Sequence, residues 1–143
     1  MAANNNPIFS ITGSVSNNAS TGMNQLITAA ANDYTGAGAN NSLVFTAGTN
    51  GSFVQRLRFK AGGTNIASVA RVFINNASSN TTATNNVFYG ELSLPATTAT
   101  AVAATADFDY VMNIAIPAGF KIYVGLGTAV AAGWVVTTIG GNY

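Results

Sequence analysis

The sequence contains no cysteine and no histidine. Without cysteine the chain can form neither a disulfide nor a thiolate metal site. Without histidine it loses the commonest general base and the commonest metal ligand. Nucleophilic pairs of the Ser–His and Cys–His kinds are excluded for the same reason. These absences predict a protein that is not an enzyme and that binds no metal ion and no cofactor.

Charged side chains are also scarce. They make up 6% of the 143 residues and leave a net charge of +1, whereas about 25% is usual in globular domains. So small a net charge gives no reason to expect a nucleic-acid partner. Free monomers ordinarily carry surface charge that prevents association. The scarcity therefore favours a chain that assembles permanently with copies of itself.

Neither a targeting segment nor a membrane span is expected. Residues 1–7 lack the basic and apolar regions of a secretory signal, and we expect them to form a flexible or docking arm. The segment Ile114–Val136 has about 23 residues and one charge, long enough to cross a bilayer as a helix. Pro117, several glycines and an apolar period of two argue against that helix and favour strands.

Apolar residues that alternate with polar ones are typical of strands, in which successive side chains point to opposite faces. The last third of the chain shows this pattern at Phe108–Ile116, Phe120–Leu126 and Trp134–Ile139. Residues 116–119, Ile-Pro-Ala-Gly, supply a compact turn between the first two strands. We expect those two strands to form a hairpin with one strongly apolar face.

The remaining strands have shorter patterns. They are expected at Pro7–Thr12, Asn24–Ala31 (with a short helix as the alternative), Leu43–Thr46, Ser52–Lys60, Ile66–Ile74 and Val87–Leu94. Asn50-Gly51 favours a type I′ hairpin turn, and the polar tract 75–86 predicts a surface loop. About eight to nine short antiparallel strands predict one all-β domain over residues 1–143, a β-sandwich of jelly-roll type.

Ser52–Lys60 has the cleanest alternation in the chain. Its pattern places Phe53, Gln55, Leu57 and Phe59 on one face and Val54, Arg56, Arg58 and Lys60 on the other. One interpretation of this basic row is a contact with an acidic partner. The interpretation we prefer is a solvated face with local ion pairs, which are common and weak. The candidate interface residues are Arg56, Arg58, Lys60, Arg71 and Trp134.

Two further groups of residues suggest chemistry. Asp107 and Asp109 share a strand face, but two carboxylates fall short of the six to eight oxygens that Ca²⁺ requires. We therefore expect them to pair with basic side chains. An aromatic platform for a sugar is a second possibility, formed by Trp134, Tyr123, Tyr89 and Tyr34. Aromatic residues at strand spacing are more often part of the core.

Several segments carry a resemblance to a known family. They are Gly51–Asn65 (GSFVQRLRFKAGGTN), Arg71–Asn76 (RVFINN), Leu94–Thr97 (LPAT), Ile116–Ile122 (IPAGFKI) and Gly127–Trp134 (GTAVAAGW). Over roughly residues 50–143 the chain resembles small all-β virion structural proteins of tailed bacteriophages, of the head-decoration or capsid-fibre type. The resemblance implies a homo-oligomer, often a trimer, that is displayed on the virion and docks on the major capsid protein or another virion protein. It identifies no catalytic residue.

The sequence thus predicts a non-enzymatic virion structural protein, a homo-oligomeric capsid decoration or particle-surface subunit, with no nucleic-acid or membrane partner. Two alternatives stay open. One is a receptor- or glycan-binding module of a phage tail or fibre, and the other is an extracellular filament subunit.

Overall fold

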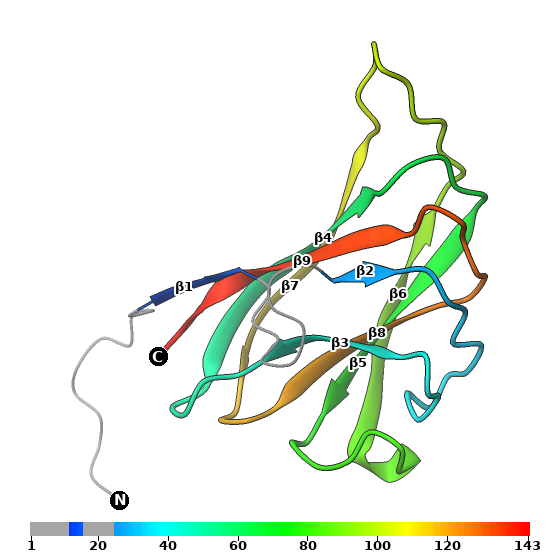
Figure 1. Ribbon diagram of the computed structural model, residues 1–143. Helices are drawn as coiled ribbons and strands as arrows, with labels where there is room; N and C mark the ends of the chain where they lie inside the picture. The colour runs from blue at the N-terminus through cyan, green and yellow to red at the C-terminus, as the bar shows by residue number, and fades with distance from the viewer. Residues whose placement is uncertain (1–11, 16–24) are drawn as a thin grey trace, which may run out of the picture.

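The computed structural model describes residues 12–15 and 25–143 (Figure 1). Within this part the chain forms nine strands and one short 3-10 helix, Ala83–Asn85. The strands are β1 Thr12–Val15, β2 Leu26–Ile27, β3 Ser42–Thr46, β4 Ser52–Ala61, β5 Ser68–Asn75, β6 Asn86–Leu94, β7 Asp107–Ile116, β8 Lys121–Leu126 and β9 Trp134–Asn142. The expected arm at residues 1–7, and the strand expected at Pro7–Thr12 apart from its last residue, lie outside the described residues.

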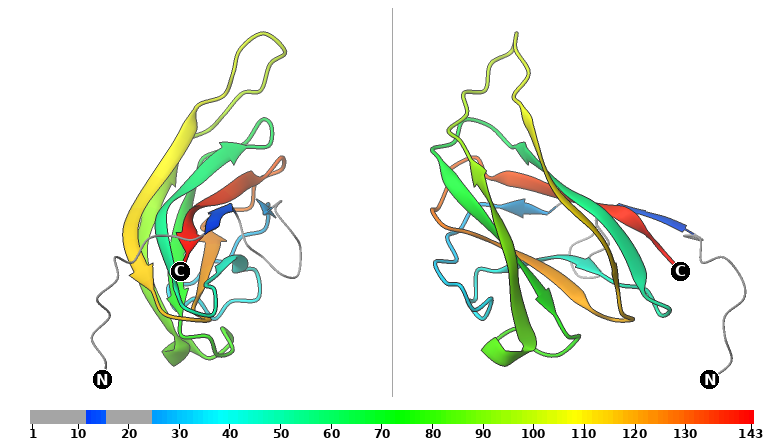
Figure 2. Two further views of the ribbon diagram at one scale, coloured as in Figure 1. Left: turned by 90° about the vertical axis from the view of Figure 1, so that its left-hand side faces the viewer. Right: turned by 180° about the vertical axis from the view of Figure 1, so that it is seen from behind.

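The strands form two antiparallel sheets that pack face to face (Figures 1 and 2). The first sheet has the order β1-β9-β4-β7, with β2 added on β9, and the second has the order β3-β8-β5-β6. Apart from β2, the chain changes sheet at every connection except β5 to β6. Eight strands in two sheets, with the first and last strands adjacent, make a jelly roll. The predicted fold class is confirmed.

The two hairpins predicted from turn residues are wrong. Residues 117–119 do reverse the chain, with Gly119 at φ 72° and the Phe120 N–H donating to Pro117 O at 3.2 Å. However, β7 pairs with β4, whereas β8 pairs with β3 and β5. The Asn50-Gly51 bend likewise joins β3 to β4, which lie in different sheets. A compact turn reverses the chain in either case, so turn chemistry does not decide between a hairpin and a sheet-to-sheet connection.

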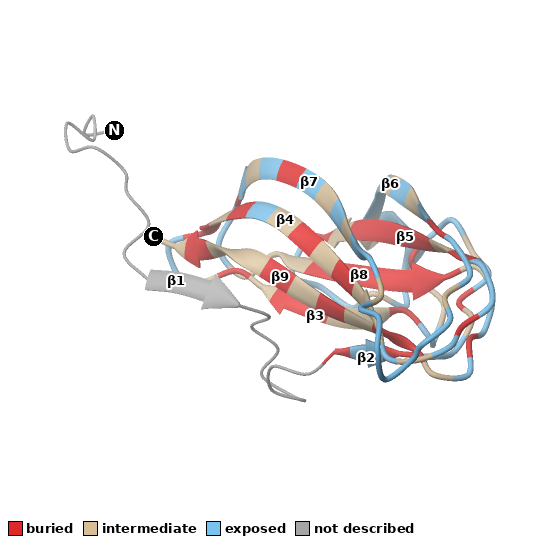
Figure 3. Cartoon of the chain, turned by 90° about the horizontal axis from the view of Figure 1, so that it is seen from above, coloured by how far each residue is buried: buried red, intermediate tan, exposed pale blue. Residues whose placement is uncertain are grey.

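The core between the sheets follows the predicted alternation (Figure 3). These inward side chains have no exposed surface: Leu57 and Phe59 on β4, Ile122, Val124 and Leu126 on β8, and Trp134, Val136 and Thr138 on β9. Residues 114–136 form the end of β7, all of β8 and the start of β9. In the described part of the chain, no helix has the length and apolar character needed to cross a membrane.

The predicted alternation fails at the start of β4. Val54 has no exposed surface, whereas Phe53 is half-buried and Gln55 is exposed. The pairing register shifts between Val54 and Arg56 against both β7 and β9. This β-bulge reverses which side chains face the core, so Phe53 and Gln55 lie on the outer face and Val54 on the inner one. Gly140 lies beside the bulge, where a Cβ would stand 2.2 Å from Phe53 O.

Candidate functional site

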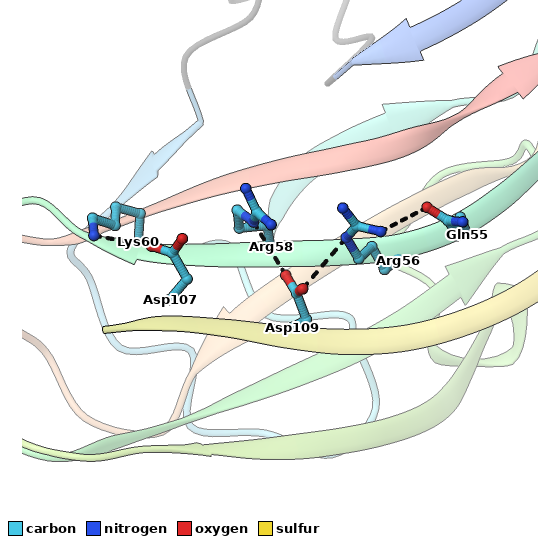
Figure 4. A network of polar contacts seen from close by, with 6 residues as sticks. All are labelled: Gln55, Arg56, Arg58, Lys60, Asp107 and Asp109. Carbon is cyan, nitrogen blue, oxygen red and sulfur yellow. Dashed lines mark hydrogen bonds and ion pairs between the residues drawn. The ribbon is translucent and has the colours of Figure 1, made fainter. Parts of the chain in front are cut away.

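The basic row of β4 lies on the outer face of the first sheet, beside the acidic residues of β7 (Figure 4). Asp109 lies between two arginines, with Oδ2 3.4 Å from Arg56 Nε and Oδ1 3.3 Å from Arg58 Nε. Lys60 Nζ is 2.9 Å from Asp107 Oδ1. The predicted pairing of these aspartates with basic side chains is confirmed. We call these five residues the charge ladder.

The charge ladder has three cations and two carboxylates, and so it keeps one positive charge. The hydrogen bond from Lys60 lowers the pKa of Asp107 below its ordinary value, and the nearby positive charges of Lys60 and Arg58 act in the same direction. Lys60 also donates to Thr105 O, and Arg56 Nη1 donates to Gln55 Oε1 at 2.7 Å. Exposure runs from 29% for Arg56 to 44% for Asp107. Ion pairs this open to water add little to stability and remain accessible to a partner.

A shallow apolar depression adjoins the charge ladder at the bulge of β4. It has a volume of about 220 Å³ and is lined by Phe53, Gln55, Ile139, Gly140 and Gly141. Gly140 and Gly141 contribute only backbone to its lining, because they carry no side chain. The hydrogen bond between Gln55 and Arg56 connects the depression to the ladder. The outer face of the first sheet therefore combines charge with accessible apolar surface.

Arg71 does not join this row, because it lies on β5 in the second sheet. It is buried, with 7% exposure. The loop between β2 and β3 covers it through Tyr34, whose ring centre is 4.1 Å from the guanidinium carbon and whose hydroxyl accepts from Nη2 at 3.1 Å. Glu91 Oε2 is 3.8 Å from Nε. The side chain of Arg71 therefore anchors a loop of its own chain.

Asp33 organises the same loop. Its Oδ1 accepts from the backbone N–H groups of Thr35 at 2.9 Å and Gly36 at 2.7 Å, and its Oδ2 accepts from Asn41 Nδ2 at 3.0 Å. Burial by itself would raise the pKa of Asp33, but the hydrogen bonds outweigh it and lower the pKa below the ordinary value. The ionised carboxylate is therefore the form that holds the loop over Arg71.

Replacing Asp33 by alanine should lower the free energy of unfolding by about 1 kcal/mol at neutral pH, since the lost hydrogen bonds are charge-assisted but partly screened by solvent. The folded state lowers the pKa of this group. Its contribution is therefore complete above the ordinary value of 3.8 and is lost as the pH falls through the lower native value. Urea titrations at a series of pH values measure both effects.

Asp33→Asn is the matched control for this experiment. It keeps an oxygen that can accept from Thr35 and Gly36, and it carries no charge to titrate. We expect a smaller loss than for Asp33→Ala and a flatter dependence on acid pH. An Asp33→Ala variant as stable as the wild type would show that the loop does not depend on this carboxylate.

Trp134 lies in the core between the sheets and has no exposed surface. Its ring meets Phe108 edge to face, with the centroids 5.7 Å apart. The sequence made Trp134 a candidate interface residue, but β2 of the same chain occupies the space beside Gly133, the residue that precedes it. A Cβ on Gly133 would stand 2.7 Å from Leu26 Cδ1. The indole therefore offers no surface to a partner.

The four aromatic residues of the expected sugar platform do not share an accessible face. Tyr123 has 8% exposure and Trp134 none, so neither ring can stack on a sugar. Only Tyr34 and Tyr89 are open to solvent, at 57% and 36%.

Sequence reasoning missed an exposed apolar edge at β6, where Val87 is 63% exposed and Phe88 39%. The rings of Tyr89 on β6 and Tyr110 on β7 meet with 6.2 Å between their centroids, and so they link the edge strands of the two sheets. A signal was present in the sequence. Three consecutive large apolar residues, 87–89, cannot all face the core from one regular strand.

In residues 12–15 and 25–143, no group of three or more acidic side chains lies close enough together to hold a metal ion. Comparisons with models of known protein families, with curated protein sequences and with solved structures find no match for this chain.

Proposed function

We propose that this protein is a non-enzymatic structural subunit on the surface of a virus particle, where it forms a homo-oligomer and docks on a capsid or other virion protein. The observation that carries the proposal is a jelly roll that leaves large apolar side chains open to water. Jelly rolls occur in viral capsid proteins, but also in lectins and cupins. Because a fold alone does not assign a function, the proposal depends on what the surface offers.

Outside the charge ladder, the surface carries few charges that could prevent association with other chains. Of the nine charged residues in the chain, five belong to the charge ladder. Arg71 is buried, so outside the ladder only Asp33, Glu91 and Lys121 remain. Meanwhile Ile66, Val87 and Val111 are each at least 60% exposed. Monomeric proteins ordinarily carry many more surface charges that prevent association, and their scarcity here supports a chain that works among neighbours.

A projecting loop adds to this accessible apolar surface. Residues 95–106, between β6 and β7, rise beyond the sandwich (Figures 1 and 2, yellow-green) and carry no charge. Val102 near the tip is 95% exposed. The base is held in place, because Thr97 and Asn65 exchange two backbone hydrogen bonds of 2.9 and 3.1 Å. A loop that is anchored at its base and apolar at its tip is suited to contact with a neighbouring protein.

The purified protein should be an oligomer at micromolar concentration. Light scattering coupled to gel filtration should give a mass that is a multiple of 14.5 kDa. A single species at 14.5 kDa would argue strongly against a subunit that assembles with itself.

Immuno-electron microscopy tests the location on a particle. Antibodies against the purified protein should label the surface of virus particles isolated on a density gradient from the source that carries the gene. Pre-absorbing the antibodies with the purified protein should abolish the labelling, which is the control. Signal confined to fractions without particles would overturn the proposal. Signal on filaments would favour the filament subunit instead.

A further inference from the structure

The charge ladder consists of two parallel stripes of opposite sign. Lys60, Arg58 and Arg56 follow one another on β4, and Asp107 and Asp109 occupy the neighbouring positions of β7. We propose that this face of the first sheet binds the same face of a second copy of the chain, about a twofold axis that runs along the strands between β4 and β7. The inference rests on the proposed function, because it names the surface through which that homo-oligomer forms.

A twofold axis in this position exchanges the two stripes and leaves the position along the strands unchanged. The cations of one copy then face the carboxylates of the other, in an interface that uses the same patch twice. The register pairs Lys60 with Asp107 and Arg58 with Asp109, so Lys60 and Arg58 each meet, in the second copy, the same aspartate that they pair with in their own chain. Two sheets packed face to face with strands aligned within about 30° are a common arrangement.

Arg56, the third residue of the basic stripe, supplies an apolar contact. Arg56 lies opposite Val111 in the register, and Val111 is 63% exposed. About the same axis, the aliphatic part of Arg56 covers Val111 of the second copy, since long basic side chains bury their stems along apolar surface. The pairing thus removes an exposed valine from water on each copy.

The order of the charges favours a second copy over an unrelated acidic partner. An acidic surface placed on the cations of β4 would also face Asp107 and Asp109, and like charges opposed across an interface strongly disfavour binding. Only a surface with the opposite order of signs matches both stripes, and the same face of another copy has that order. The twofold arrangement predicts dimers or even-numbered assemblies, in contrast to the trimer that the family resemblance implies.

Charge reversal at Arg58 tests this interface. In Arg58→Asp, the new carboxylate of each copy faces Asp109 of the other copy. Four carboxylates then crowd together about the axis, and the dissociation constant of the oligomer should rise about tenfold or more. Sedimentation velocity over a concentration series measures it. Lys121→Asp makes the same change of net charge on β8 of the second sheet, outside the ladder, and should leave the constant unchanged. Circular dichroism checks that each variant is folded.

Two complementary variants test the contact between chains directly. Arg58→Asp combined with Lys60→Asp makes the ladder acidic, and Asp107→Lys combined with Asp109→Lys makes it basic. Each variant alone should be a monomer at concentrations where the wild type is assembled, because its face repels itself. An equimolar mixture should form a one-to-one complex that weakens as salt is added. If a double variant does not fold, the exchange Arg58→Asp with Asp109→Arg, which restores the pair within and between chains, should recover wild-type affinity.

The outcomes separate this inference from the proposed function. If the charge variants assemble as tightly as the wild type, the oligomer uses another surface, and the inference is overturned while the proposed function stands. A mixture that forms no complex overturns it as well. A wild type that is a 14.5 kDa monomer contradicts both.

Discussion

Replacing Trp134 by alanine should lower the free energy of unfolding by about 3–5 kcal/mol, the range for removing a large aromatic side chain from a packed core. Trp134 has no exposed surface, and its ring packs edge to face on Phe108. The substitution leaves a cavity between the sheets that a rigid strand pair cannot close. Denaturation in urea, followed by circular dichroism because the variant contains no tryptophan, measures the loss.

Trp134→Phe is the matched control for that prediction. It keeps an aromatic ring in the core. It also removes the indole N–H, which is buried and has no hydrogen-bond acceptor among the described residues, and an unpaired buried donor is itself costly. The loss should therefore be clearly smaller than for alanine.

The fluorescence of Trp134, the single tryptophan of the chain, checks its location independently. The native protein should show a blue-shifted emission that does not respond to added sugars. Because the indole is buried within its own chain, dilution of the oligomer should not shift it either. Emission near that of free indole, with ready quenching by iodide, would contradict the burial of this side chain.

Leu57→Ala should cost about 2–5 kcal/mol, whereas Arg58→Ala should cost well under 1 kcal/mol in dilute protein. The two residues are adjacent on β4 but point to opposite faces. Leu57 has no exposed surface, and the side chain of Arg58 is 40% exposed beside Asp109. Urea titrations of both variants at low protein concentration measure the difference.

Equal losses from the two substitutions would mean that the register of β4 is wrong. Repeating the titrations at a concentration where the wild type is assembled adds a second comparison. If Arg58 lies in the twofold interface, the loss from Arg58→Ala should grow with concentration. The loss from Leu57→Ala should stay nearly constant, since that residue packs within its own chain.

The sequence by itself was enough to determine the strands and most of the core. Each strand of a sandwich buries one of its two faces in the core. Successive residues therefore alternate between apolar and polar, and this period of two can be read directly from the sequence. The predicted strand Trp134–Ile139 therefore begins where β9 begins, and the inward residues of β7 and β8 are the predicted ones. The basic row on β4 was visible for the same reason.

Only the tertiary structure decided which strands pair and which side chains meet. The turn at 117–119 reverses the chain but carries no information about the partner of β7, which is β4. The pairing of Arg58 with Asp109 joins residues 51 positions apart, and the bulge at Gln55 arises from the register with two neighbouring strands. Nothing in the sequence next to Arg71 indicates that Tyr34 covers its side chain. Strand formation depends on residues that are neighbours along the chain. Strand pairing, bulges and ion pairs depend on contacts between distant segments, which cover one another's apolar faces and pair one another's charges.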